Sequence, residues 1–126
     1  MIDVEDLRNL IVEAVNARDP NLLGQADLDD SKALTETVRV MDERWPRMMM
    51  TRGDLNGRPV GVVWMPDRNE RYRQVAHIDI AIDDGLPETS LVEGVDPDLV
   101  AESPPGRSVA EWESAVEVDH GEGRWI

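Results

Sequence analysis

The stretch Pro59–Ile82, PVGVVWMPDRNERYRQVAHIDIAI, decides the fold of this chain. Its first part, Val60–Met65, is apolar on both faces, as expected of a central strand. Its last part alternates: Tyr72, Gln74, Ala76, Ile78, Ile80 and Ile82 would share one face, and Arg71, Arg73, Val75, His77, Asp79, Ala81 and Asp83 the other. The alternation predicts a strand with one apolar face for the core and one polar face for water or a partner.

Just upstream, Asn56-Gly57 is the strongest hairpin-turn signal in the chain, because both residues tolerate positive φ. A turn there predicts strands over Met48–Leu55 and Arg58–Met65. It also sets their register, with Met49 opposite Trp64 and Met50 opposite Val63. A longer turn, Pro66–Glu70, would lead into the third strand.

Two amphipathic helices are predicted before these strands. Asp3–Arg18 carries apolar residues at helical spacing, with Asp3 as N-cap and Asp19-Pro20 as its end. A second helix would begin after Asp30 or Ser31 and stop at Pro46. Two helices that cover the apolar face of a three-stranded antiparallel meander make an α+β domain.

Residues 83–126 contrast with this core. They hold 12 acidic and 2 basic residues, against 15 and 11 in residues 1–82. They are rich in proline and lack a sustained period until Ser108–Val118, where Ser108 and Glu111 have capping-box spacing. We therefore expect a core domain over residues 1–82 and an extended acidic arm over residues 83–126, with a short helix over 108–118.

The whole chain has 126 residues, no cysteine and a formal net charge of −14. This length fits one domain. The negative charge argues against nucleic acid and anionic membrane as partners, since phosphate-binding proteins need positive surface. A basic partner and simple solubility both remain as explanations of the charge. The acidic N-terminus and the short apolar runs predict no signal peptide and no transmembrane segment, hence a cytoplasmic or virion location.

The strongest candidate for chemistry is His77 with Asp79 on the polar strand face. A histidine beside a carboxylate could act as a general base or bind a metal. An ordinary solvated sheet face is the preferred interpretation, because a zinc ion needs more ligands than these two. We therefore predict no catalytic residue, no cofactor and no metal, and expect the protein not to be an enzyme.

Candidate partner-binding residues fall into two groups. The first is the polar strand face, and the second is the acidic tail with tryptophans in weakly hydrophobic surroundings, which are typical interface anchors. The predicted contacts are Arg71, Arg73, His77, Asp79, Asp83, Glu111, Trp112, Glu113 and Trp125.

The opening helix DVEDLRNLIVEAV, the strands ending in VAHIDIAI and the C-terminal extension resemble, in element order, small head-tail and tail-terminator proteins of tailed viruses. This resemblance implies a non-enzymatic assembly protein that binds copies of itself or other subunits. An acidic inhibitor of a basic protein, either an immunity protein or a nucleic-acid mimic, is the alternative. An enzyme using His77, Asp79 and neighbouring arginines is the third and least supported hypothesis.

Overall fold

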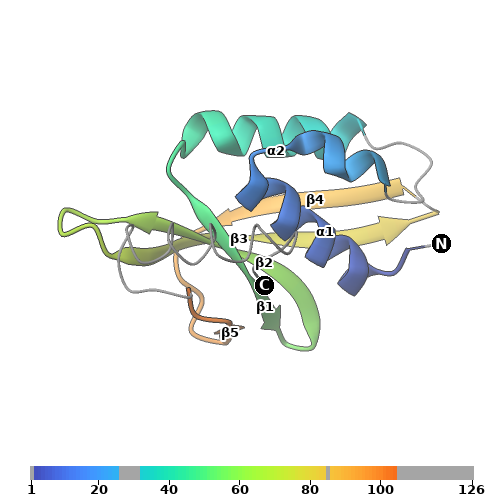
Figure 1. Cartoon of the computed structure of the whole chain (residues 1–126). Helices are drawn as coiled ribbons and strands as arrows, with labels where there is room; N and C mark the ends of the chain where they lie inside the picture. The colour runs from blue at the N-terminus through green and yellow to red at the C-terminus, as the bar shows by residue number, and fades with distance from the viewer. Residues whose placement is uncertain (1, 26–31, 85, 105–126) are drawn as a thin grey trace.

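In the computed structural model, which describes residues 2–25, 32–84 and 86–104, two helices lie on one face of a five-stranded antiparallel sheet (Figure 1). The elements are α1 (Val4–Ala17), a short 3-10 helix (Pro20–Gln25), α2 (Lys32–Arg44), β1 (Met49–Leu55), β2 (Arg58–Pro66), β3 (Tyr72–Asp83), β4 (Leu86–Glu93) and β5 (Leu99–Ala101). The α+β class is thereby confirmed. No helix in these ranges is long and apolar enough to cross a bilayer.

The strand order is β4-β3-β2-β1-β5, so the apolar β2 is the central strand. The predicted hairpin is confirmed, with Asn56 at φ 53° and Gly57 at φ 84° in its turn. Its register is also confirmed: Met49 lies opposite Trp64 and Met50 opposite Val63. A turn that requires two positive φ angles thus positions both strands.

The two faces of the sheet have different cores. The helix face, covered by α1 and α2, carries the main core, in which Val63, Ala76 and Ile78 meet Leu7 and Ile11. The outer face carries a smaller apolar cluster: Leu55, Val60 and Val62, with Trp64, Leu99 and Ala101 packed against them. The expectation of a solvated polar face is therefore wrong for much of the outer face: it carries this apolar cluster, and His77 is buried, while Ala81 and Asp83 are exposed.

Polar side chains of α1 and of its C-cap residue, Arg18, bind the backbone at β1. The amide of Asn16 donates to the carbonyl of Met50 and accepts from its N–H, both at 2.8 Å. Arg8 donates to the carbonyl of Gly53 at 2.7 Å, and Arg18 donates to the carbonyl of Met48. Burial lowers the pKa of the Arg8 guanidinium. These bonds satisfy backbone groups that would otherwise be buried without partners.

The predicted extended arm is wrong for residues 86–101, which form two strands of the sheet. β4 pairs with β3 along its whole length: Leu86 lies opposite Asp83, and Glu93 lies opposite Ala76. β5 pairs with residues 53–55 of β1. The sequence did not predict β4 because Pro87 argues against a strand. Proline is nevertheless tolerated near the start of an edge strand. β5 has 3 residues, too few to show a period. The helix predicted over 108–118 lies outside the described residues.

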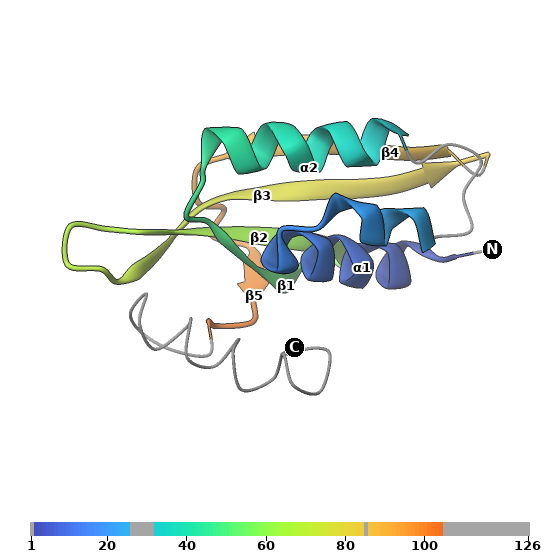
Figure 2. The ribbon, with the colours of Figure 1, turned by 45° about the horizontal axis from the view of Figure 1, so that its top comes forward.

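A β-bulge interrupts the pairing of β2 and β3. Val63 lies opposite Ala76 and Trp64 opposite Gln74, so Val75 is the extra residue. Beyond this point β2 and β3 pair only with each other, because β1 begins opposite Trp64 and β4 ends opposite Ala76. The remaining two-stranded hairpin projects from the sheet (Figure 2).

Candidate functional site

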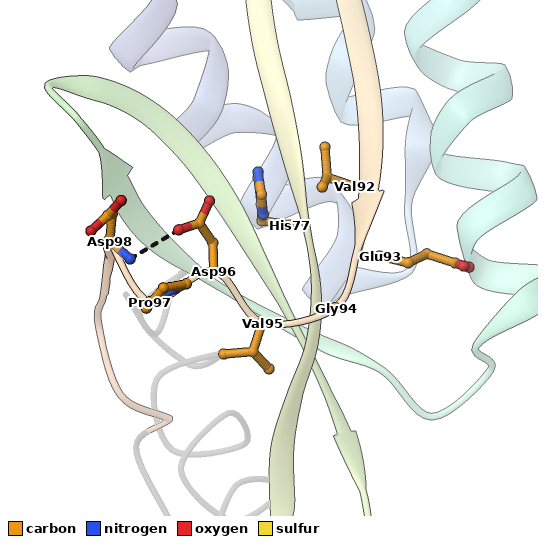
Figure 3. Close-up of a pocket in the computed structure, with 8 residues that line it drawn as sticks. All are labelled: His77, Val92, Glu93, Gly94, Val95, Asp96, Pro97 and Asp98. Atoms are coloured by element: carbon orange, nitrogen blue, oxygen red, sulfur yellow. Dashed lines mark hydrogen bonds between the residues drawn. The ribbon is translucent and has the colours of Figure 1, made fainter.

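A cavity of about 410 Å³, here called the His77 pocket, opens on the outer face beside the bulge (Figure 3). Its floor is β3, and its wall is the end of β4 with the connection to β5. The lining residues are His77, Val92, Glu93, Gly94, Val95, Asp96, Pro97 and Asp98. This volume is in the lower part of the range for small-molecule sites.

His77 is buried at 1% exposure, and neither of its ring nitrogens has a hydrogen-bond partner. Its strand neighbours are Val62 on β2 and Val92 on β4, neither of which offers a polar side chain. Buried polar atoms in proteins are almost always paired, so the two His77 nitrogens are exceptional, although both are buried below the surface of the pocket. The burial of His77 also overturns its predicted place on a solvated face.

The connection between β4 and β5 presents two carboxylates at the pocket. Asp96 accepts a hydrogen bond from the backbone N–H of Asp98 at 2.9 Å, which fixes a tight turn. In Figure 3 the Asp96 carboxylate points toward His77, whereas Glu93 points away, toward α2. Glu93 pairs there with Arg44. Among the described residues, neither Asp96 nor Asp98 has a cationic partner.

Two more polar atoms on the outer face of β3 lack hydrogen bonds, Gln74 Nε2 and Asp79 Oδ1. Arg58 Nη1 lies 3.4 Å from this Asp79 oxygen, close enough for an ion pair but without hydrogen-bond geometry. The bulge turns Gln74 to the face of Trp64, opposite to the prediction that placed it with Ala76. Gln74, His77 and Asp79 therefore form one polar row on an otherwise apolar surface.

The other predicted strand residues are dispersed. Arg73 lies opposite Met65, on the helix side of the hairpin, and pairs with Asp67 at 3.0 Å. Arg71 is exposed in the turn, and Asp83 is exposed at the end of β3. The predicted common face of Arg73 and His77 is wrong, because the bulge reverses the alternation between them. Glu111, Trp112, Glu113 and Trp125 lie outside the described residues.

The turn of the projecting hairpin, residues 67–71, is tightly held by Asp67. Its carboxylate accepts from the backbone N–H groups of Asn69 at 2.8 Å and Arg71 at 3.1 Å, and from the side chain of Arg73. The bond from Arg71, followed by that from Arg73, lowers the pKa of the Asp67 carboxyl. Glu70, at φ 60°, pairs with Arg47 at 2.7 Å. The turn is thereby preorganised.

Arg68 and Arg71 differ from the other arginines that the structure describes. Both are exposed, and neither has a carboxylate partner within the described ranges. Other arginine side chains bind carboxylates or, for Arg8, a backbone carbonyl. The carboxylate-bound ones are Arg18, Arg39, Arg44, Arg47, Arg52, Arg58 and Arg73.

The pocket is equipped for recognition by hydrogen bonding and charge. Within the described ranges, no three His, Asp or Glu residues are placed to hold a metal ion. What the pocket offers is the carboxylates of Asp96 and Asp98, and valine walls beside the buried His77. Sequence reasoning singled out His77 and Asp79 but missed Asp96 and Asp98, whose only signal is the Asp-Pro-Asp turn sequence.

The sequence matches no protein-family model, and comparisons with curated proteins and with solved structures gave no match. What the protein does has therefore to be inferred from its own surfaces.

Proposed function

We propose that this protein is a non-enzymatic assembly protein that binds neighbouring protein subunits, including copies of itself. The observation that carries the proposal is the projecting hairpin, a two-stranded ribbon that extends beyond the other strands (Figure 2) and whose turn carries the exposed Arg68 and Arg71. A turn ordered by several hydrogen bonds loses little entropy on binding, which favours recognition of another molecule.

The outer strands support the same proposal. β4 is an eight-residue edge strand with Leu86 and Val92 at 48% and 40% exposure. Natural edge strands are usually short, charged or covered, because an exposed edge can pair with another chain. A neighbouring subunit would shield this edge. A role in a virion head-tail or tail assembly stays a prediction, which ring-shaped particles in electron micrographs would support.

An acidic inhibitor of a basic protein is the second candidate. It is favoured by Asp96 and Asp98, which have no cationic partner in the described part of the chain. Such an inhibitor would be a monomer until it met its target.

Light scattering on the purified protein at about 0.15 M and about 1 M salt separates the two, since the Debye length falls from about 8 to about 3 Å. An assembly protein should form a defined oligomer at the lower salt, with the average mass rising with concentration. A monomer at every concentration and both salts would contradict the assembly proposal and leave the inhibitor.

A further inference from the structure

Resting on the assembly role, we propose that the His77 pocket receives the β2–β3 turn of a second copy of this chain, with Arg68 or Arg71 entering beside Asp96. The site is thus shared between two copies. One supplies the acceptor groups and the other supplies the cation.

The pocket has the chemistry for an arginine side chain. A guanidinium carries only donors, and its strongest partners are carboxylates, with which it forms paired hydrogen bonds. Asp96 and Asp98 supply carboxylates, and His77, at 1% exposure, closes the floor of the pocket. Val92 and Val95, at 40% and 65% exposure, can cover the methylene stem.

The hairpin supplies what the pocket lacks. Arg68 and Arg71 are exposed, and the residues between them are held by Asp67 and by the Glu70–Arg47 ion pair. Among the described residues, Arg68 and Arg71 have no carboxylate partner, and Asp96 and Asp98 have no cationic partner. Other described carboxylates also lack a cation, but the His77 pocket brings two of them to one cavity whose lining has no arginine or lysine.

The contact is expected between copies, because the hairpin extends beyond the end of β4, away from the rest of the sheet (Figure 2). Arg71 lies four positions before Val75 at the bulge, which corresponds to about 13 Å of strand at roughly 3.3 Å per residue. A tip-to-pocket contact uses two different surfaces, so it is heterologous and propagates into a ring or a filament.

The test uses two full-length double variants and their mixture. The pocket variant is Asp96→Asn with Asp98→Asn, in which asparagine can still accept the turn hydrogen bond. The hairpin variant is Arg68→Gln with Arg71→Gln, which leaves Asp67, Glu70 and Arg73 in place. Matched controls change charge by the same amounts on the exposed sides of the helices: Glu5→Gln with Asp6→Asn in α1, and Lys32→Gln with Arg39→Gln in α2.

Sedimentation velocity is run at about 0.15 M salt, where the Debye length is about 8 Å. Each test variant alone should assemble with a dissociation constant raised at least about tenfold, the effect of losing one charge-assisted hydrogen bond. Both controls should assemble like the wild type. An equal mixture of pocket and hairpin variants should form a one-to-one heterodimer and nothing larger, because it retains one intact pocket and one intact hairpin.

The outcomes separate this inference from the assembly role. If the wild type assembles and the two test variants assemble equally well, the inference is overturned and the assembly role stands. The inference is also overturned, and the assembly role stands, if the wild type assembles and the test variants are monomeric but their mixture gives no heterodimer. A wild type that is monomeric throughout overturns both.

Discussion

At the scale of single residues, this molecule treats its buried polar groups in two opposite ways. On the helix face, Asn16 and Arg8 satisfy the backbone of β1 with short, direct hydrogen bonds. On the outer face, His77 has none, and Gln74 Nε2 and Asp79 Oδ1 have none either. The first arrangement stabilises the fold. The second costs free energy unless another molecule supplies the partners.

Asn16 provides a direct test of the first arrangement. Asn16→Leu should lower the free energy of unfolding by roughly 2–4 kcal/mol, since each buried backbone group left without a partner costs about 1–3 kcal/mol. Urea denaturation measures this change. Ala17→Leu, at the exposed neighbouring position, is the control and should change stability little. Equal stability of the two variants would contradict the role assigned to Asn16.

Asp67 predicts a pH dependence of the hairpin turn. Its folded-state pKa lies below the ordinary value, so its stabilising contribution is present at neutral pH and is lost as pH falls below about 4 through the folded pKa. The carboxyl carbon shift of Asp67 in an NMR titration should have its midpoint below that of an unstructured peptide. The amides of Asn69 and Arg71 should shift with the same midpoint. A midpoint at or above the peptide value would overturn the assignment.

At the scale of elements, the bulge at Val75 has the largest effect. It reverses the side-chain alternation of β3, so that Gln74 joins the face of Trp64 while Arg73 leaves the face of His77. Alternation alone therefore predicted the faces correctly from Ala76 to Asp83 and wrongly before Val75. Nothing in the local sequence marks the bulge, because valine is a common strand residue.

The β1–β5 contact depends on a glycine. A Cβ on Gly53 would lie 2.5 Å from Val62 Cγ2 and 3.2 Å from the carbonyl oxygen of Val100. Gly53→Ala should therefore push β5 away and destabilise the fold by about 1–3 kcal/mol. Hydrogen exchange should then accelerate at Leu99–Ala101 more than at β3. Unchanged exchange at β5 would show that the sheet absorbs the methyl group elsewhere.

At the scale of the whole molecule, the sequence was sufficient for the parts that rest on local rules. The α+β class, both described helices, the Asn56-Gly57 hairpin and the central position of β2 all follow from capping, period and turn chemistry. β4 and β5 required long-range pairing that no local pattern shows. The same holds for the His77 pocket, which forms only when the connection after β4 lies over β3.

The strand order also has a consequence for how the chain reaches its native state. β1 to β4 pair with their neighbours in the chain, whereas β5 must return to β1 from 46 positions further along, as the pairing of Asp54 with Val100 shows. Closing so long a loop is slow compared with forming hairpins. We therefore expect β5 to join last, after Asn16 and Arg18 have bound the backbone at β1. During that interval, residues 53–55 remain an unpaired edge at which a misfolded dimer could start.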